Sequence, residues 1–549
     1  MKIMAIVKGS TEPPLLPYTI GGMLRKIGVV HGGNQAIISV PQNKSLTYAE
    51  LDAEADRVAA SLLSLGVRSG DRVAIWSPNC CEWLVAHYGA ARVGAVVVTV
   101  NPALRNDEVR HVLQDAGVSV LFMAGRFRAF SFIDALAAIR DTLSQLKHVI
   151  MLNSASGPGL RSWDEFLCLG QELDMSRLTD VESSVSIDDP CSLQYTSGTT
   201  GKPKGALLTH RGLLNNGYFV GERQHLSPED KICLPVPFFH CFGLVLGALG
   251  ALSHASALVL PGEGFDVVEC LTAIEQARCT AFYGVPMMFI SILTHPEFDA
   301  YDVSTLRTGC MGGASCPLTT MKDAVHRMNM REVTIAYGMT ETSPISFQSV
   351  CSDDDEIRVS TVGSIHPHLE AKVVDPATGV ILNMGQAGEL CIRGYSVMKG
   401  YWRNEASTAE AIDADGWMRT GDLGVLDENG YLKIVGRLKD MIIRGGENIY
   451  PREVEEFLLT LPAVAEAYVF GVPDDRYGEE VCAWIKLREH GSLTEHDIRE
   501  KCRGRIATYK IPRHIRLVTG FPMTSSGKVQ RAVMKAEEEA LLRESAVGS

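Results

Sequence analysis

The stretch YTSGTTGKPKG, residues 195–205, is rich in glycine and in side chains that carry hydroxyl or ammonium groups. Glycines let backbone N–H groups turn toward one point, while the hydroxyls and lysines add donors and positive charge, so the pattern predicts a polyphosphate-binding loop. It is not a P-loop, because G-x-x-x-x-G-K-[ST] requires a different glycine spacing and Lys202 is followed by Pro203. A phosphate-binding loop of this kind belongs to another architecture.

Helices and apolar strands alternate around this loop. Thr47 and Glu50 have the spacing of a capping box and begin a helix that Gly66 ends. The strand-like RVAIW follows, then a helix through residues 83–88 and the apolar run AVVVTV at 95–100. This alternation predicts an α/β fold with parallel sheets that helices cover on both faces.

The pattern changes near residue 361, where short alternating segments are separated by turns such as DENG and predict an antiparallel β subdomain. After Gly436 come a polar connector and a helix opened by Pro451, enough for a small α+β domain. The expected organisation is an N-terminal domain, a hinge and a mobile C-terminal domain. These are placed at 1–436 (with the β subdomain at about 361–436), 437–440 and 441–549.

Composition excludes several classes of protein. The 549 residues exceed what one core usually supports, and with 46% hydrophobic and 21% charged residues they predict a globular chain of at least two folding units. A net charge of −13 argues against a general nucleic-acid surface, so no nucleic-acid partner is expected. Fourteen cysteines without a C-x-x-C pair favour reduced thiols in a cytoplasmic protein over a zinc ribbon or disulfide framework.

Neither a targeting peptide nor an integral membrane span is expected. Glu12 and the neighbouring prolines interrupt any signal-like helix near the N-terminus. Residues 232–262 lack Asp, Glu, Lys and Arg, but prolines and histidines divide the run. We interpret it as a buried helix around 242–252 that leads into a strand near 257–260.

Several separated motifs together resemble the adenylate-forming superfamily, which comprises acyl-CoA synthetases, adenylation domains of peptide synthetases and firefly-type luciferases. The resemblance extends from about Leu46 to Lys535. It implies ATP and Mg²⁺ and, for an acyl-CoA synthetase, coenzyme A as cosubstrate. In the glycine-rich loop it implies phosphate contacts from Thr196, Ser197, Gly198, Thr199, Thr200, Gly201 and Lys204.

The motif YGMTE, residues 337–341, follows the strand-like VTIA. Tyr337 offers a flat face for adenine, and the resemblance places Gly338 and Met339 in the same nucleotide site. It also implies that Thr340 contacts phosphate and that Glu341 holds Mg²⁺. Taken alone, Glu341 is typical of a solvated loop acid, because magnesium sites leave little trace in sequence.

The motif MGGAS, residues 311–315, resembles the segment whose backbone passes between adenine and the acyl pocket. The resemblance therefore places Gly313, Ala314 and Ser315 at that boundary. A turn at the end of a strand is the alternative interpretation.

Three motifs precede or open the C-terminal domain. Asp422 in GWMRTGDLG matches the aspartate that binds both ribose hydroxyls, and Arg437 in GRLKD is implied to contact the ribose. Lys439 occupies the hinge position, where many relatives carry aspartate. Gly445 and Gly446 in RGGENI resemble the segment that lines the pantetheine tunnel, where glycine permits close backbone approach.

Two further residues are implied to act in catalysis. Lys528 in FPMTSSGKVQR matches the C-terminal lysine of the family, although Met523 stands where leucine is usual. A lysine near a C-terminus is otherwise typical of solvated surface. His240 in PFFHCFG matches a position that gates the acyl site, with a satisfied core histidine as the alternative.

The favoured function is an acyl-CoA synthetase that resembles medium-chain fatty acyl-CoA ligases and activates a medium-chain or bulky hydrophobic acid. Delivery to a carrier-protein thiol, a ring-containing or terpenoid acid, and a catalytically silent acyl-adenylate binder remain open, while the failed P-loop match disfavours a kinase. The expected partners are the small-molecule acid and CoA. Both monomer and homodimer remain possible.

Overall fold

The structure is a computed structural model that describes residues 3–152, 157–196, 203–314, 316–445, 447–474, 476–488, 492–523 and 529–547. The chain divides into two compact units. The larger unit comprises Val7–Ala371 and Ile392–Met418, and the smaller unit comprises Met1–Ile6, Lys372–Cys391 and Arg419–Ser549. The predicted hinge at 437–440 falls inside the smaller unit and stays a prediction.

An eight-stranded sheet in the larger unit carries the glycine-rich segment. Its strands, in spatial order, are β10 (Arg161–Ser162), β9 (His148–Met151), β6 (Val120–Met123), β4 (Arg72–Trp76), β5 (Val96–Val100), β11 (Pro190–Thr196), β12 (Lys204–Thr209) and β22 (Gly400–Tyr401). The pairs from β10 to β11 are parallel, whereas β12 and β22 pair antiparallel. The β11–β12 hairpin therefore adds antiparallel strands to a parallel sheet.

A nine-stranded sheet forms the second layer of the larger unit. Its strands, in order, are β19 (Ser364–Ile365), β18 (Ile345–Gln348), β17 (Glu332–Gly338), β16 (Thr308–Gly312), β15 (Ala281–Gly284), β13 (Lys231–Cys233), β14 (Ala257–Leu260), β2 (Gln35–Ser39) and β3 (Lys44–Thr47). The pairs from β17 to β2 are parallel. Antiparallel strands close both edges.

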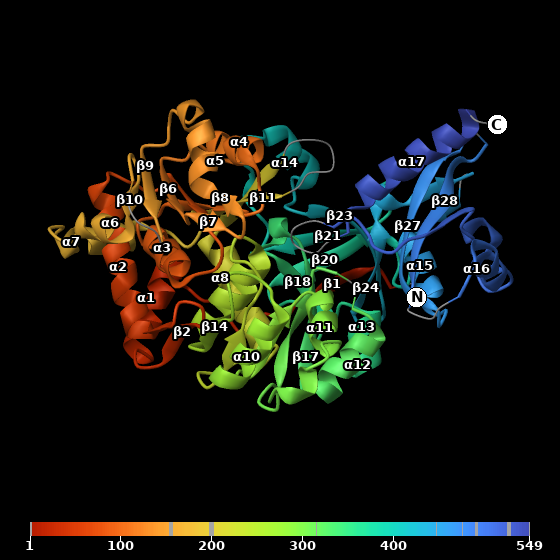
Figure 1. Ribbon diagram of the computed structural model, residues 1–549, viewed down its shortest axis with the longest axis horizontal. Helices are drawn as coiled ribbons and strands as arrows, with labels where there is room; N and C mark the ends of the chain where they lie inside the picture. The colour runs from red at the N-terminus through yellow and green to blue at the C-terminus, as the bar shows by residue number, and fades with distance from the viewer. Residues whose placement is uncertain are drawn as a thin grey trace. The chain divides into compact units, whose positions relative to one another are not determined.

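Apolar cores cover both faces of each sheet. One core joins strands of both sheets to α2 (Tyr48–Ser64), α3 (Cys81–Arg92), α8 (His210–Glu222) and η2 (Phe242–Leu249). A second core packs the eight-stranded sheet on α4 (Asn106–Ala116) and α5 (Phe132–Ile139). The third packs the nine-stranded sheet on α10 (Val267–Ala277), α11 (Pro286–Leu293) and α12 (Leu318–Arg327), which flank it in Figure 1.

The local predictions for this unit hold closely. Thr47 and Glu50 form the capping box that starts α2. The uncharged run forms the fully buried π-helix η2, the short helix α9 (Gly250–His254) and strand β14. Among the described residues, no helix combines the length and apolarity needed to cross a bilayer.

The smaller unit contains most of the five-stranded sheet β1 (Ile6–Lys8), β20 (Leu369–Val374), β21 (Gly388–Gly394), β23 (Met418–Leu426) and β24 (Leu432–Arg437). A separate sheet combines β26 (Glu447–Ile449), β25 (Ile442–Arg444), β28 (Gly478–Leu487), β27 (Val464–Asp474) and β29 (His514–Leu517). Helices α15 (Pro451–Leu459) and α17 (Arg531–Val547) contact β27. The predicted α/β class, with a β-rich part and an α+β C-terminal region, is confirmed.

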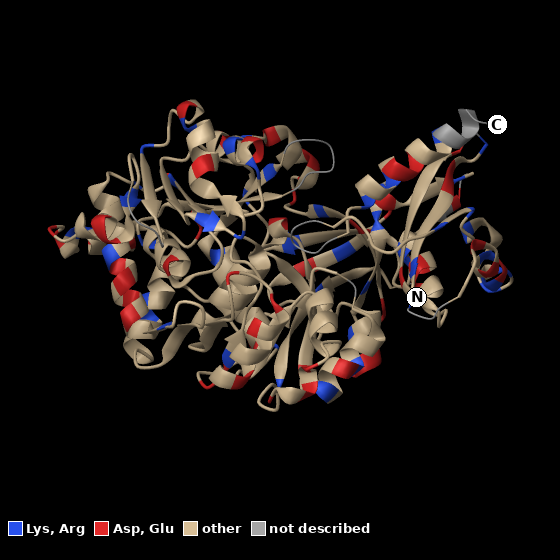
Figure 2. Ribbon diagram, in the orientation of Figure 1, with Lys and Arg blue, Asp and Glu red and all other residues tan. Residues whose placement is uncertain are grey.

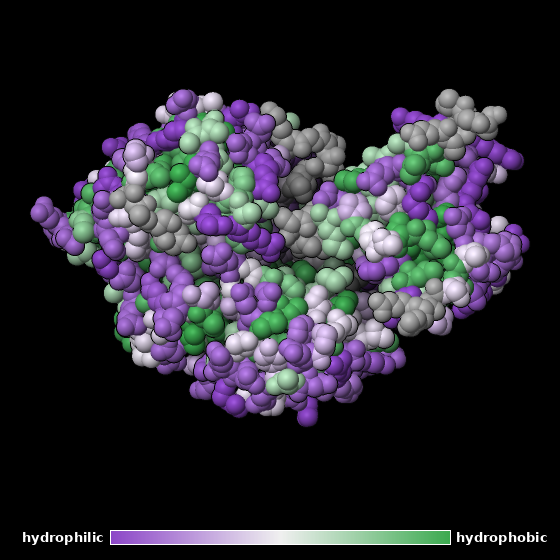
Figure 3. Space-filling model, in the orientation of Figure 1, coloured by the Kyte–Doolittle hydropathy of each residue, from purple (hydrophilic) through white to green (hydrophobic). Residues whose placement is uncertain are grey.

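Charge and hydropathy follow this layering. Lys, Arg, Asp and Glu lie mainly on helices and loops in Figure 2, while the strands are largely uncharged. Hydrophilic residues cover most of the face shown in Figure 3, and apolar residues appear there in separate patches. The apolar strands predicted at 72–76 and within 95–100 correspond to β4 and β5, which are almost entirely buried.

Candidate active site

The glycine-rich segment is described at both of its ends. Thr196 ends β11 and pairs with Lys204, which begins β12. The predicted phosphate contacts of Ser197, Gly198, Thr199, Thr200 and Gly201 lie outside the described residues. The hairpin nevertheless fixes where the segment leaves and re-enters the eight-stranded sheet.

The motifs MGGAS and YGMTE follow neighbouring strands of the nine-stranded sheet. Strands β16 and β17 are parallel, so their carboxyl ends lie at the same edge, the usual place for ligands in such sheets. Gly313 and Ala314 are exposed directly after β16, whereas Ser315 lies outside the described residues. Tyr337 is half-buried near the end of β17.

Gly338 is required by close packing at this edge. A Cβ atom on Gly338 would lie 1.8 Å from the Pro344 carbonyl oxygen, which is far inside van der Waals contact. The Met339 amide donates to the same oxygen over 3.0 Å. The backbone is therefore held where Thr340 and Glu341 begin the short helix η4 (Thr340–Thr342).

Glu341 lies at the centre of a polar cluster. Only 5% of the residue is exposed, and its Oε1 accepts hydrogen bonds from Thr196 Oγ1 over 3.2 Å and from the Tyr401 hydroxyl over 3.0 Å. These donors come from β11 and β22 of the other sheet. The cluster thus joins the end of the predicted phosphate loop to the predicted magnesium ligand.

Tyr401 also faces a cation. The Lys204 ammonium lies 5.2 Å from the centroid of the Tyr401 ring, within the range of a cation–π interaction. Burial and the adjacent Glu341 carboxylate both raise the pKa of Tyr401, so its hydroxyl stays protonated and donates. Lys204, Tyr401 and Glu341 therefore form a continuous polar path.

Cys241 lies beside the same carboxylate. Its thiol donates to Gln194 Oε1 over 3.0 Å. Burial raises the pKa of Cys241, and Glu341 adds to the rise, while hydrogen bonds with Thr340 and Gln194 oppose it. The thiol is thus neutral and positions its neighbours instead of acting as a nucleophile.

His240 precedes Cys241 and is half-buried. Its Nδ1 accepts a hydrogen bond from the Phe242 amide over 3.2 Å at the start of η2. The ring of Phe242 approaches Tyr283, with centroids 6.4 Å apart, and its Cε1 atom lies near Gly312. The predicted gating histidine is therefore followed by an aromatic side chain that packs at the end of β16.

Asp422 and Arg437 meet in the smaller unit. The antiparallel strands β23 and β24 place them opposite each other, and Arg437 Nε donates to Asp422 Oδ1 over 3.1 Å. Asp422 is 8% exposed, whereas more than half of the Arg437 side chain is exposed. Burial, followed by the charge of Arg437, lowers the pKa of Lys439 at the predicted hinge.

Gly445 adopts a left-handed conformation with φ of 57°, and its amide donates to the Tyr477 carbonyl over 2.8 Å. Gly446 and Lys528, also predicted from sequence, lie outside the described residues. The chain on either side of the Lys528 segment is held by an antiparallel bridge between Met523 and Val529.

Sequence reasoning did not select Tyr401, Cys241 or Gln194 as site residues. Tyr401 and Cys241 lie beside Glu341, and Gln194 accepts a hydrogen bond from Cys241, but these residues are distant in the sequence and meet only after both sheets have formed. The one sequence feature that could have indicated Tyr401 is that it follows Gly400 in the segment SVMKGYW, so that an aromatic residue comes directly after a glycine. No local pattern distinguishes such a pair from a turn.

Comparisons with known proteins identify the family of the chain. The profile of the AMP-binding enzyme family matches residues 25–402, and the profile of the AMP-binding enzyme C-terminal domain matches residues 453–528. Acyl-CoA ligase sidI of Aspergillus fumigatus is 40% identical over 553 residues, which cover 97% of this chain and 93% of that protein. Medium-chain acyl-CoA ligase ACSF2, mitochondrial, of Danio rerio is 39% identical over 547 residues, with coverage of 97% and 90%.

A solved structure, ATP-bound MatB from Rhodopseudomonas palustris, matches with a TM-score of 0.81 at 29% identity and covers 95% of this chain and 100% of that one. The chain therefore belongs to the AMP-binding enzyme family. The predicted class, an AMP-forming acid–thiol ligase of the acyl-CoA synthetase type, is confirmed.

Proposed function

We propose that this protein converts a medium-chain carboxylic acid, ATP and CoA into an acyl-CoA thioester through an acyl-adenylate. The carboxylate first attacks the α-phosphorus of ATP to form acyl-AMP and releases pyrophosphate. The CoA thiol then attacks the acyl carbon, releases AMP and loses its proton. The observation that carries the proposal is the Thr196–Glu341–Tyr401 cluster beside the predicted phosphate loop, in a chain similar over nearly its full length to medium-chain acyl-CoA ligases.

The two-step route follows from the chemistry of carboxylates. A carboxylate cannot acylate a thiol directly because oxide would have to leave, whereas a mixed anhydride with AMP has a stable phosphate as leaving group. In the first step an anion attacks an anion, so positive charge must face the phosphoryl oxygens. Residues 195–205 supply donors and lysines for the departing pyrophosphate, and Lys528 supplies the cation at the reacting phosphate.

Glu341 suits Mg²⁺ because, among the described residues, the side chains that donate to its carboxylate are neutral hydroxyls and none forms an ion pair with it. When bound with ATP, the ion neutralises phosphate charge. Thr340 contacts the α-phosphate and Tyr401 holds the carboxylate in place. Water access to this site is limited by the burial of Glu341.

The remaining nucleotide contacts are assigned by type of group. Tyr337, with Gly338 and Met339, receives adenine, and the exposed Gly313 and Ala314, followed by Ser315, separate adenine from the acyl pocket. Asp422 accepts hydrogen bonds from both ribose hydroxyls, and Arg437 holds Asp422 in place. His240 lies at the entrance to the acyl pocket.

Thiolation requires a second arrangement because Lys528 has no role once pyrophosphate has left. We assign the exchange to rotation of the C-terminal domain, 441–549, about Lys439, with Gly445 and Gly446 lining the thiol path. We place the reaction in the cytoplasm.

The test is a screen of pyrophosphate release and thioester formation over straight-chain, ring-containing and terpenoid acids, with and without CoA. We expect adenylation to be highest for straight chains of medium length and thioester to form only with CoA. If the enzyme forms acyl-AMP but transfers the acyl group to a carrier-protein thiol and not to CoA, the acceptor is the carrier protein. A preference for ring-containing acids would show that the substrate is not a straight medium-chain acid. The absence of ATP cleavage with every acid would exclude the proposed function.

A further inference from the structure

A second group of reactive side chains lies at the opposite edge of the nine-stranded sheet. His225 follows α8, Glu332 begins β17 and Cys351 follows β18. One ligand atom from each of the three lies within 4.8 Å of the others. Since β17 rises about 3.3 Å per residue, Glu332 lies roughly 20 Å from Gly338, so this group is separate from the adenylation site.

The backbone holds all three residues in position. His225 has a φ of 52°, and Arg307 fixes this left-handed conformation by donating to the His225 carbonyl over 2.8 Å. The Cys351 thiol donates to the Arg223 carbonyl over 3.0 Å and to the Glu332 carbonyl over 3.4 Å. Three separate chain segments therefore present nitrogen, oxygen and sulfur to one small space.

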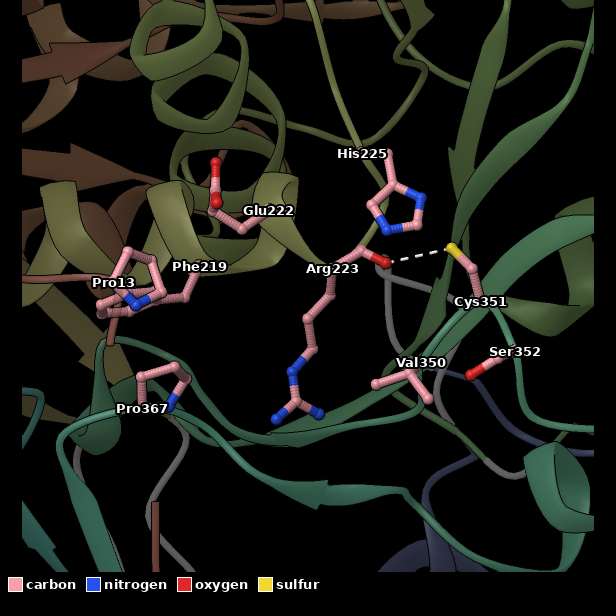
Figure 4. A pocket seen from close by; sticks show the side chains of 9 residues that line it. All are labelled: Pro13, Phe219, Glu222, Arg223, His225, Val350, Cys351, Ser352 and Pro367. Atoms are coloured by element: carbon pink, nitrogen blue, oxygen red, sulfur yellow. Dashed lines mark hydrogen bonds between the residues drawn. The ribbon is translucent and has the colours of Figure 1, made fainter. Parts of the chain in front are cut away.

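A cavity of about 290 Å³ gives access to this space from solvent. His225 and Cys351 line it, and Figure 4 shows the imidazole and the sulfur side by side at one end. This volume is large enough for several water molecules. A hydrated ion can therefore reach the group and keep one or more water ligands.

The surrounding charges favour a cation. Arg307 pairs with both Asp230 and Glu332, which leaves one negative charge in excess. The other charges that act on the thiol, Arg358 and Asp353, are opposite in sign. Deprotonation of Cys351 adds a second negative charge, which matches a divalent ion.

We propose that His225, Glu332 and Cys351 bind a divalent metal ion of the zinc class, with water from the cavity completing a tetrahedral site. Imidazole, carboxylate and thiolate are the ligands that Zn²⁺ takes in proteins, and its bonds of about 2.0–2.3 Å require only small side-chain rotations from the present separations. Binding exchanges the thiol proton for the metal, and no electron is transferred. The ion links the end of α8, the start of β17 and the end of β18.

A nucleophilic role for Cys351 fits the geometry less well. Burial raises the pKa of the Cys351 thiol to about 11, so the thiolate is scarce at neutral pH until a metal replaces the proton. Because the three ligands come from three chain segments, a bound ion is expected to stabilise the amino edge of the sheet.

The test uses purified full-length protein titrated with Co²⁺ and with Zn²⁺ against a chromophoric chelator. We expect one equivalent to bind, thiolate-to-Co²⁺ charge-transfer absorption in the near ultraviolet, and a higher Tm with Zn²⁺. Cys351→Ser and His225→Asn should each weaken binding at least 10-fold, and Cys351→Ser should abolish the absorption. Asparagine is chosen because it tolerates the left-handed backbone at residue 225.

Cys168→Ser and His326→Ala are matched controls, because each removes an exposed residue of the same type outside the group. Both should bind metal as the unsubstituted protein does, and the Tm without metal establishes that each variant is folded. Equal affinity in all variants, absorption that persists in Cys351→Ser, or no stoichiometric binding would overturn the proposal. Glu332→Gln should weaken binding less, because Glu332 is shared with Arg307.

Discussion

Glu341 in the larger unit and Asp422 in the smaller unit are both buried carboxylates that the sequence motifs assign to nucleotide binding, yet their hydrogen-bond donors differ. Glu341 accepts hydrogen bonds from two neutral hydroxyls, Thr196 and Tyr401. Asp422 accepts a hydrogen bond from the guanidinium of Arg437, which lies opposite it in the β23–β24 pair. Among the described residues, Glu341 has no ion-pair partner, whereas Asp422 already has a counter-ion in Arg437.

This difference indicates different tasks. A carboxylate surrounded by neutral donors attracts an added cation, as a magnesium ligand must. A carboxylate held by arginine is fixed in orientation and suits hydrogen bonds to neutral hydroxyls, as ribose binding requires. Substitution of each residue should therefore affect a different kinetic parameter.

The largest effect is expected from Lys528→Ala, which removes the proposed cation at the reacting phosphate. Pyrophosphate release should fall by about 10³-fold, while thioester formation from synthetic acyl-AMP and CoA should be retained. Stopped-flow or quenched-flow assays of the separate half-reactions measure the rates of pyrophosphate release and of thioester formation. Equal losses in both half-reactions would remove the assignment of Lys528 to the adenylation step.

Glu341→Gln should lower the rate of adenylation by about 10²-fold and raise the Mg²⁺ concentration needed for half-maximal rate. The amide keeps the size of the side chain but removes the charge that the hydroxyls leave available. The KM for ATP at saturating Mg²⁺ should change little. A variant that responds to Mg²⁺ as the unsubstituted protein does would assign the ion to another residue.

Asp422→Ala should mainly raise the KM for ATP, by roughly 10- to 100-fold, because a hydrogen bond to an ionised group contributes about 1.5–3 kcal/mol. The Mg²⁺ dependence should be unaffected, in contrast to Glu341→Gln. Comparing ATP with 2′-deoxy-ATP provides the control, since the variant should no longer distinguish them. Continued discrimination would place the ribose elsewhere.

The smallest effect is expected from Tyr401→Phe, which removes one donor to Glu341 while keeping the ring that faces Lys204. Thr196 still donates to the same oxygen, so adenylation should fall only about 3- to 10-fold, with a higher Mg²⁺ requirement. Tyr218→Phe, outside the cluster, is the matched control. A lower Tm without any change in Mg²⁺ dependence would limit Tyr401 to a structural role.

Local sequence patterns predicted the elements that carry the site. The capping box at Thr47 starts α2, and the apolar runs at 72–76 and 95–100 correspond to β4 and β5. The predicted helix at 242–252 was correct in position, but most of it is a π-helix. The sequence could not show this, because apolar periodicity does not distinguish α-helical from π-helical turns in a fully buried segment.

The predicted partners of individual side chains were less complete. YGMTE indicated Glu341, but Tyr401 and Thr196 reach it from another sheet. The Asp422–Arg437 pair depends on strand register, which the turn between β23 and β24 sets together with a bulge. The roles of Lys528, Gly446 and the centre of the phosphate loop stay predictions.

The sequence by itself determined the α/β class, the order of its elements and the motifs that define the family, because these depend on short-range periodicity and on residue types at fixed spacing. Only the tertiary structure decided which donors satisfy Glu341 and Asp422, and which three segments bring together His225, Glu332 and Cys351. Such contacts join residues far apart in the chain, and sheet register and packing, which no local pattern encodes, set their geometry.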